Sequence, residues 1–214
     1  MNISAWLFTL VELVGTIAFS LSGAMTAIKH KLDIFGILLL SSTTALGGGV
    51  IRDLIIGITP PMMFRDYKYL LAAVVSSAIL FFIARTANAQ YHAKETDIEA
   101  YINVFDALGL GAFTVTGIQA GIQAGFADNG FLLIFLALVT GIGGGILRDL
   151  FVQQMPLVFR RRIYGLADIL GGCLYLTLYS LHISTVVISA VVILMVFTIR
   201  MLATKYHWNL PTAD

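Results

Sequence analysis

The stretch Gly47-Gly48-Gly49-Val50-Ile51-Arg52-Asp53-Leu54 returns 96 residues later as Gly143-Gly144-Gly145-Ile146-Leu147-Arg148-Asp149-Leu150. Matches continue on both sides of it. Downstream, Pro61, Phe64 and Arg65 correspond to Pro156, Phe159 and Arg160. Upstream, Glu12, Phe19, Gly23 and Gly36 correspond to Asp106, Phe113, Gly117 and Gly130. Ordered matches that need only small gaps indicate an internal duplication.

The composition around these repeats indicates a membrane protein. The chain has 214 residues, of which 58% are hydrophobic and 12% charged, whereas soluble domains carry about 25% charged residues. A membrane-spanning helix needs about 20 apolar residues. Apolar runs of this kind predict an all-α protein with seven transmembrane helices, at about 5–28, 35–58, 67–86, 103–124, 131–153, 163–182 and 184–203.

The duplication fixes the expected topology. Each copy holds three predicted spans, so the second copy enters the membrane from the opposite side and the two are inverted repeats. The predicted organisation is a first three-helix repeat (1–86), a polar linker (87–102), an inverted repeat (103–182), and a seventh helix with a cytoplasmic tail (183–214).

Lysine and arginine in the loops indicate the orientation. The side where the first and third predicted spans end carries nine of the 13 basic residues, and the N-terminal side carries only Arg65 and Lys68. The bias places the N-terminus outside and the C-terminus in the cytoplasm. The nine are Lys29, Lys31, Arg85, Lys94, Arg160, Arg161, Arg162, Arg200 and Lys205.

The glycine triplets, Gly47–Gly49 and Gly143–Gly145, are the first candidate functional residues. A glycine in a helix costs about 1 kcal/mol relative to alanine, and three in a row invite a kink or a break. Paired broken helices in inverted repeats mark transport sites near mid-membrane. Close helix packing is the alternative; the repetition with Arg-Asp at the same distance favours broken helices that line a path.

Charged residues inside predicted spans are the other candidates, because charge within a membrane is costly and usually functional. Structural bracing by ion pairs, with each residue finding its partner in the other repeat, competes with a role in the electrostatics of a pathway. For Asp168, Arg148 and Arg161 are possible partners. The set comprises Arg52, Asp53, Arg148, Asp149, Asp168, Glu12 and Asp106.

Several classes of function are disfavoured. A net charge of +1 provides no basic patch for nucleic acid. The single cysteine, Cys173, can form no internal disulfide or metal cluster, so no cofactor and no resident metal are expected. No recurring nucleophile–base pair and no phosphate-binding loop suggest an enzyme.

The paired glycine and Arg-Asp segments within seven spans resemble the prokaryotic branch of the TRIC family, the trimeric intracellular cation channels, whose bacterial members are also grouped as presumed glycine transporters. The resemblance covers the chain from about Glu12 through the seventh span. It implies a homotrimer with one pore per subunit, second and fifth helices kinked at the glycines, and conduction of monovalent cations, mainly potassium. Eukaryotic members carry a lipid-binding Lys-Glu-Val motif, which this chain lacks. The resemblance and the charge bias suggest the inner membrane of a bacterium or archaeon.

Three functions stay open from the sequence. One is a potassium channel lined by the glycine-kinked helices, with membrane lipids and cations as its partners. Another is a secondary transporter of glycine or a similar small zwitterion, because inverted repeats with broken helices also suit alternating access. The third is a structural or lipid-organising membrane protein that transports nothing.

Overall fold

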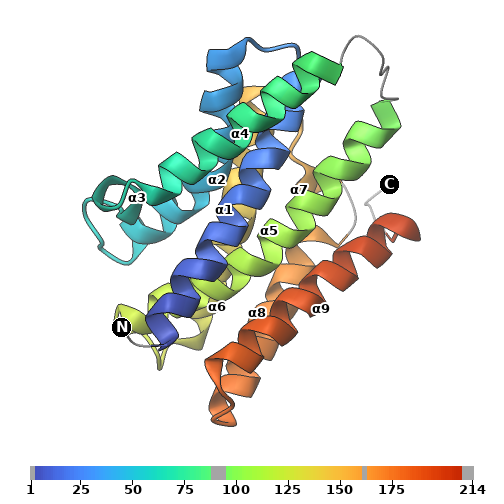
Figure 1. Ribbon diagram of the computed structural model, residues 1–214. Coiled ribbons are helices and arrows are strands. Elements are labelled where there is room, and N and C mark those ends of the chain that lie inside the picture. The colour runs from blue at the N-terminus through green and yellow to red at the C-terminus, as the bar shows by residue number, and fades with distance from the viewer. Residues whose placement is uncertain (1–2, 88–94, 161–162, 209–214) are drawn as a thin grey trace.

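The computed structural model describes residues 3–87, 95–160 and 163–208. The described part is helical, and its helices follow the predicted order (Figure 1). They are α1 (Ile3–Lys29), α2 (Ile34–Ile55), α3 (Met62–Arg65), α4 (Lys68–Ala87), α5 (Glu95–Gln123), α6 (Gly130–Phe151), α7 (Leu157–Arg160), α8 (Tyr164–Ser180) and α9 (Thr185–Lys205).

Among the described residues, six helices are long and apolar enough to cross a membrane, namely α1, α2, α4, α5, α6 and α9. They coincide with six of the seven predicted spans, and the chain is a multi-pass membrane protein. The predicted span at 163–182 corresponds to α8, which has 17 residues, slightly fewer than the usual ~20. The membrane crossing of α8 stays a prediction.

The first helices of the two repeats form the centre of the bundle. α1 and α5 lie side by side and run in opposite directions (Figure 1). In the most apolar stretch of each helix, 72% of α5 and 61% of α1 is buried inside the bundle, against 17% of α4. We call the side where α1 begins and α5 ends the N-terminal face, and the opposite side the C-terminal face. α9 packs against α5 and α8.

The two helices that contain a glycine triplet, α2 and α6, begin after equivalent capping residues. Asp33 Oδ1 accepts a hydrogen bond from Gly36 N at 2.7 Å, and Asn129 Oδ1 accepts one from Leu132 N at 3.0 Å. These side chains satisfy backbone donors that the first turn of a helix leaves unpaired. The two caps place the starts of α2 and α6 at matching points of the two repeats.

Replacing Asp33 with alanine is expected to destabilise the protein by about 1 kcal/mol, the usual contribution of such a cap. Chemical unfolding of purified protein in detergent measures the change. Asp33→Asn keeps an acceptor oxygen and should stay close to the wild type. An equal loss for both variants would mean that Asp33 stabilises the chain in some other way.

The prediction of broken helices at the glycines is wrong. The backbone is helical through both triplets, and α2 and α6 are each one continuous element. Because the interior of a continuous α-helix pairs its own N–H and C=O groups, the triplets free no backbone atoms to hold ions. A bend without a break stays a prediction.

The sequence did not predict the two short helices that follow the Arg-Asp pairs. α3 comes after Pro61 and α7 after Pro156, at equivalent places in the repeats. α5 also begins earlier than its predicted span, so its first turns lie within the predicted 87–102 linker. Residues 88–94 of that linker lie outside the described ranges.

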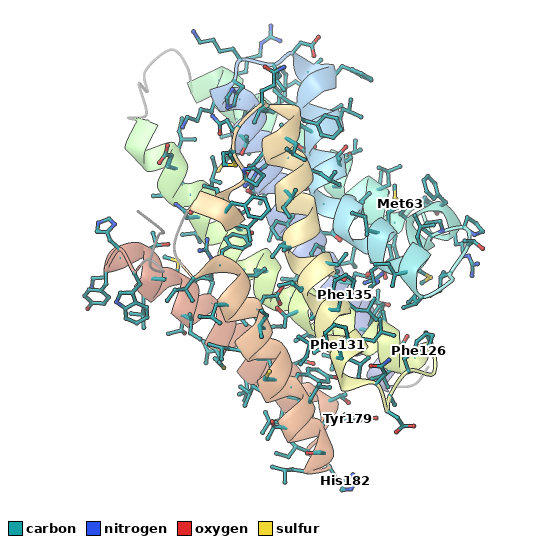
Figure 2. All side chains as sticks on the ribbon, turned by 180° about the vertical axis from the view of Figure 1, so that it is seen from behind. Met63, Phe126, Phe131, Phe135, Tyr179 and His182 are labelled. Atoms are coloured by element: carbon teal, nitrogen blue, oxygen red, sulfur yellow. The ribbon has the colours of Figure 1, made fainter. Side chains whose placement is uncertain are left out.

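Large apolar side chains cover the outside of the bundle. Figure 2 shows Phe131 and Phe135 on the outer surface of α6, and Phe131 is 84% exposed in the single chain. Such surfaces match a lipid or protein environment rather than water. A set of polar side chains, in contrast, is buried inside the bundle.

Candidate functional site

The first buried ion cluster surrounds Arg52 near the end of α2. Its Nε donates to Asp53 Oδ1 at 2.9 Å, and its Nη1 donates to Glu12 Oε1 of α1 at 3.1 Å. All three side chains are buried. Glu12 Oε2 has no hydrogen-bond partner among the described residues. Glu12 is therefore buried between helices of the bundle.

A second cluster surrounds Arg148 at the equivalent place in α6. Its Nε donates to Asp149 Oδ1 at 2.8 Å, and its Nη1 donates to Asp106 Oδ1 of α5 at 2.7 Å. Ser22 of α1 donates to the same Asp106 oxygen at 2.6 Å. Tyr164 Oη donates to Asp106 Oδ2 at 3.4 Å. Both carboxylate oxygens of Asp106 are therefore engaged.

Both clusters also fix the chain that follows the glycine helices. Asp53 Oδ2 accepts a hydrogen bond from Met62 N at 2.8 Å, and Asp149 Oδ2 accepts one from Leu157 N at 2.9 Å. These donors are at the first residues of α3 and α7. The Arg-Asp pairs thus tie the end of each glycine helix to the short helix after it, which supports the bracing role considered from the sequence.

The prediction that each charged residue finds its partner in the other repeat is wrong. Arg52 binds Glu12 and Arg148 binds Asp106, within the first and the second repeat respectively. Ser22 is the described contact that joins the second cluster to the first repeat. The neighbouring helix of the same three-helix unit supplies each carboxylate, because α1 packs on α2 and α5 packs on α6.

Asp168 belongs to neither cluster. It is fully buried in α8, and Thr114 Oγ1 of α5 donates a hydrogen bond to its Oδ1. Its Oδ2 has no partner among the described residues. This oxygen packs against Gly141, where an added Cβ would lie only 2.7 Å from it. Among the described residues Asp168 forms no hydrogen bond or ion pair with Arg148, whose partners are Asp106 and Asp149, and Arg161 lies outside the described residues.

The middle glycines let α2 and α6 touch through their backbones. A Cβ on Gly48 would overlap the carbonyl oxygen of Thr140, and a Cβ on Gly144 would overlap that of Thr44. Within α2 the threonine precedes the glycine by four residues, and the same holds within α6. Small residues at this spacing are typical of close membrane helix crossings. Packing, the alternative considered for the triplets, therefore explains Gly48 and Gly144.

The other glycines of the triplets have different neighbours. A Cβ on Gly143 would lie 3.2 Å from Gly48 Cα, and one on Gly47 would lie 2.5 Å from Leu147 Cδ1. Gly49 and Gly145 have more space, with Arg52 Nη2 at 3.7 Å and Tyr164 Oη at 3.5 Å as the nearest atoms. They face two small equivalent cavities of about 20 Å³ and 10 Å³. Each cavity therefore lies between a glycine triplet and its arginine.

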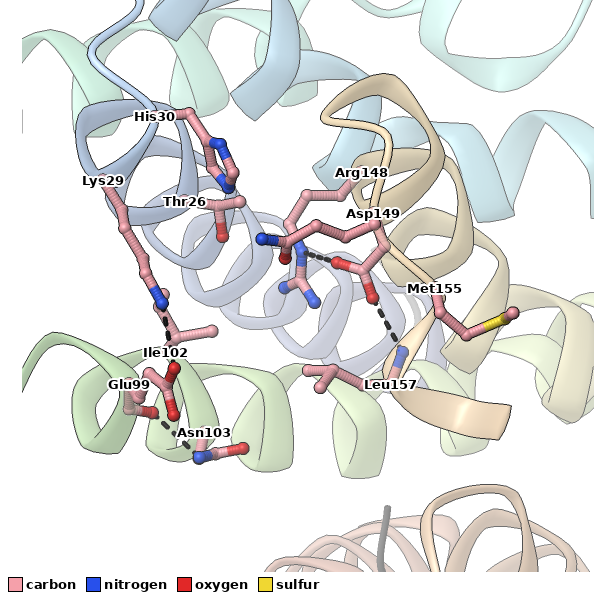
Figure 3. A pocket seen from close by; sticks show the side chains of 11 residues that line it. Thr26, Lys29, His30, Glu99, Ile102, Asn103, Arg148, Asp149, Met155 and Leu157 are labelled. Atoms are coloured by element: carbon pink, nitrogen blue, oxygen red, sulfur yellow. Dashed lines mark hydrogen bonds and ion pairs between the residues drawn. The ribbon is translucent and has the colours of Figure 1, made fainter. Parts of the chain in front are cut away.

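A larger polar cavity of about 200 Å³ opens beside the Arg148 cluster at the C-terminal face (Figure 3). Lys29 Nζ and Glu99 Oε1 form an ion pair of 2.9 Å at its edge. His30 Nε2 is buried there without a hydrogen-bond partner among the described residues. The lining comes from the end of α1, the start of α5, the end of α6 and the segment before α7, and includes Thr26, Ile102, Asn103, Gln154 and Met155.

Some of these residues were not identified as candidates from the sequence. Tyr69 and Tyr164 line the two small cavities at equivalent places, and the same repeat spacing that relates Pro61 to Pro156 would have found them. Arg200 was counted among the loop charges but is 3% exposed, with its guanidinium 4.1 Å from the centre of the Tyr164 ring. Its position within the predicted span at 184–203 was the signal that could have marked Arg200, because charge inside a membrane helix is costly.

Comparisons with known proteins agree with this architecture. A family model described as Glycine transporter matches residues 9–85 and 103–180, one segment in each repeat. A UPF0126 membrane protein of Vibrio cholerae is 31% identical over 96% of this chain and 82% of its own length. The UPF0126 inner membrane protein YadS of Escherichia coli K12 is 31% identical over 94% of both chains.

Solved structures are also similar. The TRIC trimeric intracellular cation channel orthologue from Rhodobacter sphaeroides superposes with a TM-score of 0.85 at 29% identity, over 94% of this chain and 99% of its own. A prokaryotic TRIC channel crystallised in 0.5 M KCl gives a TM-score of 0.84 at 32% identity, over 96% and 100% of the two chains. These structural neighbours are cation channels, not enzymes.

Proposed function

This chain belongs to the family of the prokaryotic TRIC channels, and from that premise we propose that it is a monovalent cation channel that conducts mainly K⁺ along a path within each subunit. The observation that carries the proposal is a series of buried polar side chains through an otherwise apolar bundle. Buried polar groups in membrane helices are costly and usually line a pathway or pair with one another. Here they do both.

The proposed path begins at the large cavity on the C-terminal face. It passes Thr26 and then Ser22, where Arg148 and Asp106 meet. Further along α1, Thr16 and Glu12 line the small cavity of about 20 Å³ beside Arg52. α1 therefore presents polar side chains to both clusters. The path runs beside the crossing of α2 and α6, since the middle glycines leave no room between those helices.

The charges of the clusters favour cations. Each cluster joins one arginine to two carboxylates: Arg52 to Glu12 and Asp53, and Arg148 to Asp106 and Asp149. With these groups ionised, each cluster has a formal charge of −1. Fixed negative charge beside a narrow path attracts cations and repels anions. Hydroxyl groups such as Thr16 and Ser22 offer oxygen atoms to a partly hydrated K⁺.

We extend the proposal to assembly and location. The protein acts as a homotrimer in contact with membrane lipids, which accords with the exposed apolar surfaces of α4 and α6 and with the trimeric TRIC orthologue. It resides in the inner membrane of a bacterium or archaeon, with the N-terminus outside and the C-terminus in the cytoplasm. The loop charges support this orientation.

Recordings from purified protein in a planar bilayer test the proposal. Unequal KCl on the two sides should give unitary currents that reverse near the K⁺ equilibrium potential. Currents that reverse near the Cl⁻ potential would contradict cation selectivity. The complete absence of currents from correctly assembled protein would contradict the channel itself.

A carrier of glycine or a similar small zwitterion is the second candidate. The description of the matching family model favours it, and the large cavity presents both signs of charge, with Lys29 and Glu99 at its edge. Uptake of radiolabelled glycine into proteoliposomes separates the two candidates. Saturable uptake without unitary currents supports the carrier, and currents without saturable uptake support the channel.

A further inference from the structure

We infer that an apolar plug closes the proposed path on the N-terminal face, while the C-terminal face is open to the large cavity. The inference rests on the proposed cation path and adds the place where that path is gated. The plug is a cluster of side chains from the ends of α1, α2, α5 and α6. Its members are Phe8, Ile56, Ala120 and Leu136, with Ile58 and Leu132 packed against them.

The plug lies between the N-terminal face and the Arg52 cluster. Phe8 precedes Glu12 by one turn of α1, and Ile56 follows Arg52 by one turn at the end of α2. Glu12 and Arg52 are bonded to each other. On the proposed path, a cation that leaves the Arg52 cluster toward the N-terminal face passes the plug.

Backbone hydrogen bonds show that the two ends of the path correspond residue by residue. Ile58 N donates to Asp53 O at 2.8 Å, and Gln154 N donates to Asp149 O at 2.8 Å. Ile58 and Gln154 thus hold the same position after the two Arg-Asp pairs. One is a member of the plug, and the other lines the large cavity.

Two further equivalent positions, those of Phe8 and Ala120, differ in the same way. The spacing that relates Glu12 to Asp106 pairs Phe8 with Ile102 and Thr26 with Ala120. Ile102 and Thr26 line the large cavity, whereas Phe8 and Ala120 belong to the plug. The first repeat thus has an aromatic ring where the second has a smaller aliphatic chain. The inverted repeats are symmetric in backbone and asymmetric in the chemistry of their two ends.

An apolar constriction stops ions without a charged barrier. Water leaves a narrow passage lined only by apolar groups, and an ion cannot cross it without its hydration shell. The plug offers no hydroxyl or carboxylate to replace that shell. Opening would require that Phe8 leave Ile56 and Leu136, through a movement of α1 relative to α2 and α6.

Two substitutions give the plug the chemistry of the open end. Phe8→Ile introduces the side chain of the equivalent Ile102, and Ile58→Gln introduces that of Gln154. Both are expected to raise the open probability in bilayer recordings several-fold. Phe8→Ile makes the constriction wider, and Ile58→Gln adds a polar group that can hydrogen-bond to water there. Ile58 is only partly buried, so Ile58→Gln tests the plug without a large change in packing.

Matched controls are available on the same face. Phe131→Ile makes the same exchange at a residue on the outside of α6, and Leu181→Gln adds a polar group at an exposed residue. Both should leave the open probability at the wild-type value. Gel filtration and thermal unfolding confirm that each variant is folded.

The outcomes separate the plug from the channel. If the wild type conducts and both folded variants conduct with the same open probability, the plug is wrong and the channel stands. If the wild type and both folded variants conduct nothing, the proposed channel fails and the plug with it. Higher open probability in the two plug variants, but not in the controls, supports the plug.

Discussion

Replacing Gly144 with alanine is expected to prevent the two glycine helices from packing and to leave little correctly folded protein. The new methyl group would overlap the carbonyl oxygen of Thr44, which is backbone and cannot rotate away. α2 and α6 would have to separate, and with them the α1–α2 and α5–α6 pairs that hold both ion clusters. Overpacking usually costs 1–3 kcal/mol and more where the backbone itself must move. Gly48→Ala should act similarly through Thr140.

The neighbouring glycines provide the control. A methyl group on Gly145 would have Tyr164 Oη at 3.5 Å as its nearest neighbour, and one on Gly49 would have Arg52 Nη2 at 3.7 Å. Gly145→Ala and Gly49→Ala should therefore yield normal amounts of monodisperse protein by gel filtration in detergent. If all four variants fold equally well, the close helix crossing is not what requires the glycines.

The second large effect is expected from Arg148→Met. The change leaves Asp106 and Asp149 buried without their cation, and such a loss typically costs 3–5 kcal/mol. Thermal unfolding in detergent should show a large decrease in stability. Arg52→Met should cost less, since the Arg52–Glu12 contact of 3.1 Å is longer than the Arg148–Asp106 contact of 2.7 Å, and Glu12 is 7% exposed where Asp106 is completely buried.

A rescue variant separates lost charge pairing from lost packing. Arg148→Met combined with Asp106→Asn and Asp149→Asn removes both unpaired charges and keeps an acceptor for Leu157 N. It should recover much of the stability of Arg148→Met, because replacing a whole buried ion cluster is far less costly than breaking it. If the triple variant is as unstable as Arg148→Met alone, the ion pairs are not the source of the loss.

The repeats could be predicted from the sequence because the same residue types recur in the same order in both halves of the chain. Nearly equal spacings, from Glu12 to Asp106 and from the first Arg-Asp pair to the second, identified equivalent positions before any contact was known. The membrane environment and the approximate helices followed from composition and apolar runs. The bounds of α8 agree with the predicted span at 163–182, but its 17 residues lie at the lower limit of a membrane span, so its crossing stays a prediction.

The break of the two helices at the glycines was wrongly predicted for a physical reason. A glycine run lowers helix propensity and also permits close approach, and the sequence does not say what lies opposite it. The decisive fact is the carbonyl oxygen of Thr140 against Gly48, a contact between residues far apart in the chain. Packing within the bundle overrode the low propensity, as tertiary contacts often do.

The partners of the charged residues could not be predicted from the sequence either. Glu12 and Asp106 could be recognised as equivalent, but their bonds to Arg52 and Arg148 depend on the packing of α1 on α2 and of α5 on α6. The large cavity gathers residues from four separate segments, and no local pattern joins them. Asp168 was a candidate for the pathway because it is charged; its hydrogen-bond partner Thr114 could not be read from the sequence, and its place in a pathway stays a prediction.

The most direct test of a cation path within each subunit is to obstruct that path chemically during a recording. Gln154 is exposed and lines the large cavity, so Gln154→Cys in a Cys173→Ser background places one reactive thiol at the proposed mouth. Leu32→Cys, exposed on the same face, is the control. A cationic thiol reagent added to the C-terminal face should reduce the K⁺ current of Gln154→Cys in steps and leave that of Leu32→Cys unchanged. Complete modification of Gln154→Cys with no change in current would contradict the path.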